Sequence, residues 1–291
     1  MTARVATAAA VAVLALAAPA ASLGAHTKPF RGAGTWVDIY DRHGIWKNPE
    51  AVVDELAYQG VRTLYVESGN FHFSPLRANL AHPSRLARFV DSAHAAGIRV
   101  VAWYLAGLDL HRRDRRRILA ALRFRTATGA RFDGFALDIE SNRIGSIPRR
   151  NRAAIRLSRK IRTWVGRRFP LGAIVPDSRS TTLSYGLWPG FPYRSLRRYY
   201  DVFLPMAYST YRARGAKGVY SYTRHNIDLI RRRTGGSRVP IHVIGGIAAG
   251  LSGKEARAVV RAVNRGGAIG ASFYSYRTSR QRHWDALLGL R

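Results

Sequence analysis

The sequence of 291 residues contains no cysteine. Disulfide bonds, thiol catalysis, cysteine-held metal sites and a lipid-modified N-terminal cysteine are therefore excluded. An exported protein without disulfides fits a bacterial exporter better than a eukaryotic secretory route, because eukaryotic secreted domains commonly depend on them.

Acidic residues are scarce: Asp and Glu number 17 against 48 Lys and Arg, and the formal net charge is +31. Such a surface attracts polyanions, whether nucleic acid, acidic lipid or an anionic cell-wall polymer. Lysine is also scarce, and the arginines recur along the whole chain at helical spacing beside Ala, Ile and Leu. This pattern predicts outer faces of amphipathic helices. A specific nucleic-acid reader concentrates its charge on one element, whereas here the charge is spread along the chain, so specific nucleic-acid binding is not expected. Nucleic-acid or phosphate binding rests on charge alone.

Long uncharged runs are lacking except at the N-terminus. Arg4 precedes an apolar run from Ala8 to Ala18, followed by Pro19 and small residues up to Ala25. This layout is typical of a secretory signal peptide, with cleavage after Ala25 or a few residues earlier. A retained membrane anchor is the alternative, but a span needs about 20 strongly apolar residues and this run is Ala-rich and interrupted. We therefore expect residues 1–25 to be removed and the mature protein to be secreted or cell-wall associated, with no membrane span.

Beyond residue 30, short apolar stretches alternate with amphipathic ones. The apolar stretches, at 34–41, 61–69, 98–107, 132–141, 169–177, 201–210, 239–250 and 268–278, are rich in Val, Ile, Leu, Ala and Phe without clean alternation. That composition is typical of parallel strands buried on both faces. Eight strand–helix units predict a single-domain (β/α)8 TIM barrel, α/β in class, over residues 30–291, expected to be monomeric. A doubly wound sheet is the alternative, but it needs a Gly-rich turn after the first strand, which the sequence lacks.

The active site of such a barrel lies at the carboxyl ends of its strands. This rule selects polar and aromatic residues late in the predicted strands: Asp38, Tyr40, Glu67, Trp103, Tyr104, Asp138, Glu140, Tyr208, Ser209, Tyr274 and Tyr276. The late aromatic residues can stack on sugar rings, whereas Trp36 lies early in its strand and is interpreted as core. Asp38 and Glu67 are open to two interpretations, as participants in the chemistry or as partners of other site residues.

Asp138 and Glu140 carry the strongest signal. Residues at i and i+2 of a strand share a face, and Ala136 lies below them on that face. Two carboxylates this close cannot both ionise easily, so one pKa rises and a proton donor stands beside an anion. Glycoside cleavage needs that pair. The alternative is that Asp138 forms a salt bridge with an arginine inside the barrel. Asp133 precedes the strand core and is interpreted as a turn or cap residue.

Two segments resemble a known family. Residues 133–140, DGFALDIE, resemble the fourth-strand signature D-G-x-D-x-D-x-E of the chitinase-like family 18 glycoside hydrolases and related glycosyl hydrolase barrels, with Ala136 in place of the first inner Asp. Residues 205–209, PMAYS, resemble the family's sixth-strand Met-x-Tyr-Asp through Met206 and Tyr208, with Ser209 in place of Asp. The tetrapeptide LDIE also resembles the fourth-strand segment of the lysozyme-like family 25 muramidases.

The family 18 resemblance implies roles for three residues. Glu140 would be the general acid, Asp138 would orient and stabilise a substrate N-acetyl group that acts as an internal nucleophile, and Tyr208 would hydrogen-bond that acetyl group. The departures at Ala136 and Ser209 favour another glycan over chitin, or a loss of activity.

These observations together predict an exported glycoside hydrolase that acts on a carbohydrate substrate, with electrostatic attraction to anionic cell-wall polymers. No cofactor or metal is expected, because the nine histidines show no metal-ligand spacing. A serine nucleophile is not expected either, because Ser141 and Ser209 lack a nucleophile motif. The alternative function is a catalytically silent barrel that binds cell-wall glycan or another polyanion.

Overall fold

A computed structural model describes residues 26–41, 43–72, 79–109, 111–236 and 238–291. The predicted signal peptide, residues 1–25, lies outside the described residues. Within the described ranges, no helix is both long enough and apolar enough to cross a membrane.

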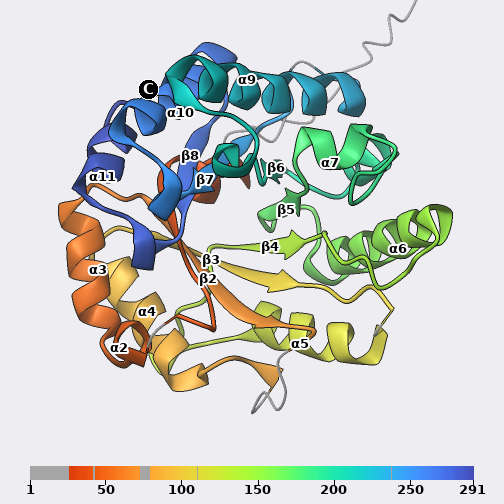
Figure 1. Ribbon diagram of the computed structural model, residues 1–291. Helices are drawn as coiled ribbons and strands as arrows, with labels where there is room; N and C mark the ends of the chain where they lie inside the picture. Colours follow the sequence, from red (N-terminus) through yellow and green to blue (C-terminus); the bar gives the residue numbers. More distant parts are fainter. Residues whose placement is uncertain (1–25, 42, 73–78, 110, 237) are drawn as a thin grey trace, which may run out of the picture.

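Eight parallel strands form one sheet that closes on itself (Figure 1). The strands are β1 (Gly32–Val37), β2 (Thr63–Asn70), β3 (Arg99–Leu105), β4 (Gly134–Asp138), β5 (Leu171–Val175), β6 (Val202–Pro205), β7 (His242–Ile247) and β8 (Gly270–Tyr274). β1 pairs with β8 as well as β2, and the order runs β6-β5-β4-β3-β2-β1-β8-β7. Two parallel bridges, Phe203 to Ile241 and Met206 to Ile244, join β6 to β7. The predicted (β/α)8 barrel is therefore confirmed.

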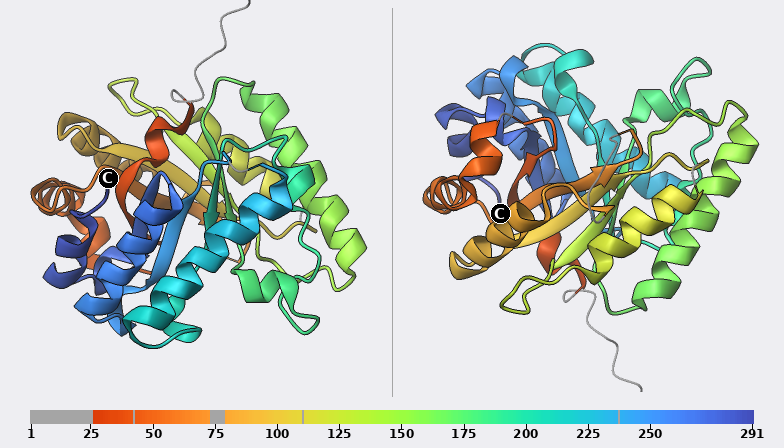
Figure 2. Two further views of the ribbon diagram at one scale, coloured as in Figure 1. Left: turned by 90° about the horizontal axis from the view of Figure 1, so that it is seen from above. Right: turned by 90° about the horizontal axis from the view of Figure 1, so that it is seen from below.

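Helices enclose the strands in both views of Figure 2. They are α2 (His43–Lys47), α3 (Pro49–Tyr58), α4 (Pro83–Ala95), α5 (His111–Arg123), α6 (Ile147–Val165), α7 (Ser178–Thr182), α8 (Tyr193–Leu196), α9 (Gly215–Thr234), α10 (Gly253–Gly266) and α11 (Gln281–Leu287). Within the described ranges the chain also forms the 3₁₀ turns η1 (Lys28–Phe30), η3 (Ser209–Tyr211), η4 (Ala248–Gly250) and η5 (Tyr276–Thr278).

Three helical segments differ from the sequence prediction. The short α2 and α7 were not predicted, because a helix of five residues is too short to show a hydrophobic period. α9 begins at Gly215 rather than at residue 221, although two glycines in its first turn disfavour helix. Burial of Val219, 1% exposed, anchors that turn against the core and outweighs the propensity.

The barrel interior is filled by apolar and aromatic side chains. Phe30, just before β1, belongs to this interior cluster and is fully buried. A Cβ on Gly172 would lie 2.8 Å from the Phe30 ring and 2.7 Å from Leu204, so a larger residue in β5 would displace the Phe30 ring. A second apolar cluster fills the space between the strands and the helices. Inward and outward side chains of each strand therefore belong to different cores.

A buried polar network surrounds His242 inside the barrel, near the amino-terminal ends of the strands. Its Nδ1 lies 2.8 Å from the Phe30 carbonyl oxygen and its Nε2 lies 3.0 Å from Ser272 Oγ, which also accepts a hydrogen bond from Trp36 Nε1 at 2.8 Å. A neutral imidazole satisfies every partner by donating from Nδ1 and accepting at Nε2. Burial lowers the pKa of His242 from 6.5 to about 4.

We expect this histidine to make the protein less stable in mild acid. Its folded pKa is depressed, so the unfolded state binds the proton more readily between pH 6.5 and about 4, and the free energy of unfolding falls as pH falls through that range. The loss should reach roughly 3 kcal/mol. Denaturant unfolding of the parent and of His242→Gln at several pH values measures it, since the carboxylates titrate in both proteins. Equal pH dependence in the two proteins would contradict this role.

Candidate active site

Strand β4 carries the two carboxylates to the carboxyl-end rim of the barrel. Asp138 is the last residue of β4, Glu140 follows two residues later, and Ala136 lies below them in the interior cluster. Asp138 is 5% exposed, and its Oδ1 has no hydrogen-bond partner among the described residues. Neither carboxylate forms an ion pair with any arginine in the described ranges. The geometry therefore gives no support to the salt-bridge interpretation of Asp138.

The two carboxylates influence each other's protonation. Burial raises the pKa of Asp138 well above its usual value, and the charges of Glu140 and then Glu67 raise it further. Burial also raises the pKa of Glu140. Because the groups interact strongly, their protons are released in two steps that belong to the pair. The pair can therefore hold one proton and one negative charge at a pH where two isolated carboxyl groups would both be ionised.

Both carboxylates line a cavity of about 240 Å³ that opens at the rim. Its lining consists mainly of aromatic and aliphatic side chains with a few polar groups: Trp36, Tyr40, Glu67, Asn70, Trp103, Leu105, Asp138, Glu140, Ile174, Met206, Tyr208, Ile244, Ile247 and Tyr274. Trp36 and Trp103 meet edge to face with ring centroids 5.9 Å apart. Aromatic walls of this kind offer flat apolar faces, and carboxylates between them offer acid–base chemistry.

Two further side chains of the lining have polar groups suited to a ligand. The indole Nε1 of Trp103 is buried and has no hydrogen-bond partner among the described residues, so it can donate to a bound oxygen. Tyr208, two residues beyond Met206, has its pKa raised by burial and by the charges of Glu140 and Asp138, which keeps its hydroxyl protonated as a donor.

Asp38 does not line the cavity but holds two residues that do. Its Oδ2 accepts a hydrogen bond of 2.6 Å from the hydroxyl of Tyr274, and its Oδ1 accepts one of 2.7 Å from the backbone of Tyr40. Asp41, which the sequence analysis did not select, accepts a hydrogen bond from the backbone N–H of Asp38 and forms an ion pair with Arg277 at 3.3 Å. Burial and the Asp38 charge raise the pKa of Asp41 to about 6.

Glu67 lies in the cavity wall beside a residue that the sequence analysis missed. Its Oε2 accepts a hydrogen bond of 3.0 Å from the backbone of Ile39, and its Oε1 accepts one of 2.8 Å from Asn70 Nδ2. Burial raises the pKa of Glu67 to about 8. Strict alternation would separate Glu67 from Asn70, but the ladder with β3 shifts register between Glu67 and Gly69. This irregularity brings both side chains to the cavity.

Besides Asp38, three selected residues do not line the cavity. Tyr104 faces the helix layer and donates a hydrogen bond of 2.8 Å to Asp114, because consecutive residues of a strand point to opposite faces and Trp103 occupies the inner one. Tyr276 lies beyond β8 in η5 and donates to Glu55 of α3. The remaining one, Ser209, donates a hydrogen bond of 2.9 Å to the carbonyl of Gly245 in β7 and is fully buried.

Asp133 has a structural position, as predicted. Its Oδ2 accepts a hydrogen bond of 2.7 Å from the backbone of Val100 and lies 2.9 Å from His94 Nε2, at the amino end of β4. Across the described part of the chain, no group of three or more His, Cys, Asp or Glu side chains is arranged to hold a metal ion.

Comparison with known proteins gives structural matches only: no protein-family model and no curated protein matches the sequence. The spore cortex-lytic enzyme SleL of Bacillus cereus superposes with a TM-score of 0.63 at 10% identity, covering 90% of this chain and 75% of that one. A chitinase of Chromobacterium violaceum gives 0.62 at 13%, covering 89% and 98%. A class V chitinase of Pseudomonas fluorescens gives 0.64 at 11%, covering 89% and 99%. At such identities the likeness establishes a shared fold.

Proposed function

We propose that the protein is an exported glycoside hydrolase that cleaves an N-acetylated glycan of cell-wall type. One observation carries this proposal: Asp138, with an unpartnered buried oxygen, stands beside Glu140 in a cavity walled by aromatic side chains. Structural neighbours named as chitinases and as a spore cortex-lytic enzyme support it, because chitin is an N-acetylated glycan and the spore cortex is a wall layer.

In this mechanism Glu140 donates its proton to the glycosidic oxygen as the bond from that oxygen to the sugar breaks. In the protonation state that reacts, the proton shared by the pair is on Glu140. The ionised Asp138 then stabilises the positive charge that develops on the sugar, and it orients the N-acetyl group whose oxygen attacks the sugar carbon. Tyr208 hydrogen-bonds the acetyl group. Water then opens the cyclic intermediate and returns a proton to Glu140, so the carboxylates recover their starting state.

The proposal is tested by incubating the purified protein with chitin oligosaccharides, peptidoglycan and poly-N-acetylglucosamine, beside cellulose and mannan oligosaccharides as chains without acetamido groups. We expect new reducing ends from at least one N-acetylated glycan and none from the other chains. Cleavage of cellulose or mannan alone would contradict the role of the acetamido group. Binding of N-acetylated glycans without cleavage would identify the silent barrel.

Export is the second part of the proposal. We expect protein recovered outside the cell to begin near residue 26, because residues 1–25 have the layout of a processed signal peptide. Mass spectrometry of the N-terminal peptide from culture medium or cell wall measures this. Recovery of the intact N-terminus from the cytosol, with none outside, would contradict export.

A further inference from the structure

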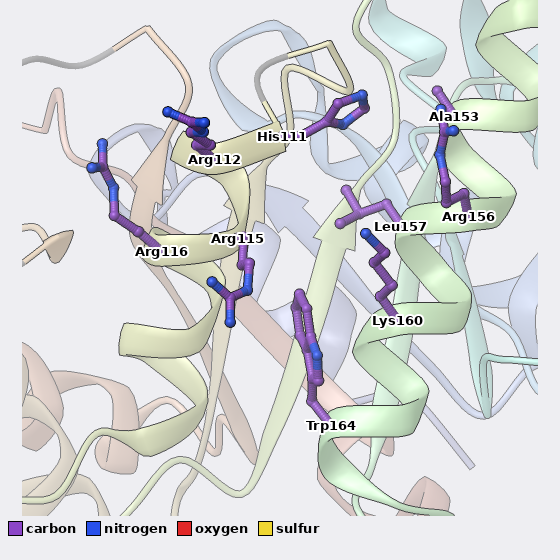
Figure 3. A pocket seen from close by; sticks show the side chains of 9 residues that line it. All are labelled: His111, Arg112, Arg115, Arg116, Ala153, Arg156, Leu157, Lys160 and Trp164. Carbon is purple, nitrogen blue, oxygen red and sulfur yellow. The ribbon is translucent and has the colours of Figure 1, made fainter.

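A second hollow lies on the outer wall of the barrel, in the groove between α5 and α6 (Figure 3). Its volume is about 430 Å³, larger than the cavity that holds Asp138 and Glu140. Five cationic side chains line this α5–α6 groove, together with apolar ones and no acidic one: Arg112, Arg115, Arg116, Arg156 and Lys160 beside Leu157 and Trp164.

The helical spacing of these residues explains the concentration of charge. Arg112, Arg115 and Arg116 stand at i, i+3 and i+4 on α5 and therefore share one face. On α6, Lys160 and Trp164 stand one turn apart. Figure 3 shows Arg115 and Lys160 extending into the space between the two helices, with Trp164 upright beside them.

Other arginines of the same helices have structural partners. Arg113 donates a hydrogen bond of 2.9 Å to the Phe71 carbonyl, and Arg162 pairs with Asp201 at 2.8 Å. By contrast, none of the five groove cations forms an ion pair with any residue that the structure describes. Like charges gathered without counter-charges create a strong local attraction for anions.

The side chains of the groove indicate what kind of anion fits. An arginine guanidinium matches the geometry of a carboxylate or a phosphate with two parallel hydrogen bonds. Trp164 is half-buried and offers a flat apolar face beside those cations. A ligand that alternates anionic groups with rings satisfies both features, and two polymers have that composition: an anionic glycan and a single-stranded nucleic acid.

The position of the groove favours the glycan. α5 and α6 follow β3 and β4, the strands that carry Trp103 and Asp138, so both helices begin on the side of the barrel where the cavity opens. We infer that the α5–α6 groove binds a segment of an anionic glycan, through carboxylate or phosphodiester groups on its cations and a sugar ring on Trp164. The choice of a glycan rests on the proposed function, whereas binding itself requires no catalysis.

Binding is measured with the full mature chain by titration calorimetry at low and physiological salt. The probes are oligogalacturonate for carboxylates, glycosylated poly(glycerol phosphate) for phosphodiesters, methyl-esterified oligogalacturonate as the uncharged counterpart, and oligothymidylate for nucleic acid. The groove variant is Arg115→Gln with Lys160→Gln. The matched control is Arg152→Gln with Arg159→Gln, which removes the same charge from exposed positions of α6 outside the groove.

We expect the groove variant to lose about tenfold or more in affinity for at least one anionic glycan, and the control less than about threefold, because contacts to charged partners exceed diffuse attraction. The salt dependence of binding should also weaken only in the groove variant. Of the two anionic glycan probes, the one that binds the parent protein more tightly shows whether the groove prefers carboxylate or phosphodiester groups.

Equal losses in the groove variant and the control would overturn the inference, as would equal binding of the methyl ester. Oligothymidylate binding more tightly than both glycans, with a loss confined to the groove variant, would overturn the assignment to a glycan. Failure of the proposed function is recognised separately, because cleavage of uncharged N-acetylated oligosaccharides involves the cavity and none of these probes.

Discussion

Replacing Glu140 by Gln is expected to lower the turnover of a cleaved glycan by about 10²-fold or more, the usual effect of losing a general acid. The amide keeps the volume of the side chain but carries no proton to donate. Folding should be unaffected, because Glu140 lies beyond the end of β4 and forms no ion pair with a described residue. Initial rates and melting temperature, measured on the same preparation, check both statements.

Substrates with different leaving groups make the test specific for proton donation. A dinitrophenyl glycoside releases a phenolate that needs no proton, so Glu140→Gln should impair its cleavage far less than cleavage of the natural glycan. Glu50→Gln is the matched control, since Glu50 lies on the outer helix α3 and its ion-pair partner in the described ranges is the exposed Arg88. Equal impairment of both substrates, or unchanged turnover of the glycan, would remove Glu140 from the role of acid.

Replacing Asp138 by Asn should reduce turnover on the order of 10²-fold, because the developing positive charge loses its counter-charge. The pH profile should change at both ends. The acid limb flattens, since Asp138 no longer has to ionise. The alkaline limb moves to lower pH, since a neighbouring negative charge favours the protonated form of a carboxyl group and the amide removes that charge from beside Glu140. Rates of kcat/KM between pH 4 and 9 measure both changes.

The same variant separates catalysis from stability. Asp138 has no arginine partner in the described ranges, so Asp138→Asn should leave the melting temperature unchanged or raise it, because a buried charge is costly. Removing one member of a buried ion pair would instead cost about 3 to 5 kcal/mol. A marked fall in melting temperature with normal turnover would therefore assign Asp138 a structural role. Loss of activity with retained stability is typical of side chains held in place for function.

The main features of the fold could be predicted because each strand carries its own signal. Apolar stretches of similar length, separated by amphipathic ones, allow few architectures for parallel strands. The rule that active-site residues lie at the carboxyl ends of the strands selected Asp138, Glu140, Trp103 and Tyr208, and these four residues line one cavity. The rule worked for them because their positions follow from simple alternation along β3, β4 and the end of β6. Short helices such as α7 escaped prediction because five residues give no period.

The remaining errors come from interactions that a single strand does not reveal. Tyr104 was selected with its neighbour, although alternation allows only one of two adjacent residues to face inward. Asn70 was missed because the register shift after Glu67 depends on pairing with β3. Asp41 was missed because its role lies in holding Asp38, a contact between residues of one loop. The α5–α6 groove required two helices to be placed side by side before its charges could be recognised as a group.

The pairing of β1 with β8 has a consequence for how the chain is made. Gly32 is registered with Gly270 and Thr35 with Phe273, so the first strand finds one of its two neighbours only after nearly the whole chain has been synthesised. Closing so long a loop carries a large entropic cost, which makes this contact a late one. A nascent chain therefore exposes both edges of an open sheet until its last strand emerges. If the proposed export takes place on an unfolded chain, the barrel can close only after β8 has emerged from the membrane.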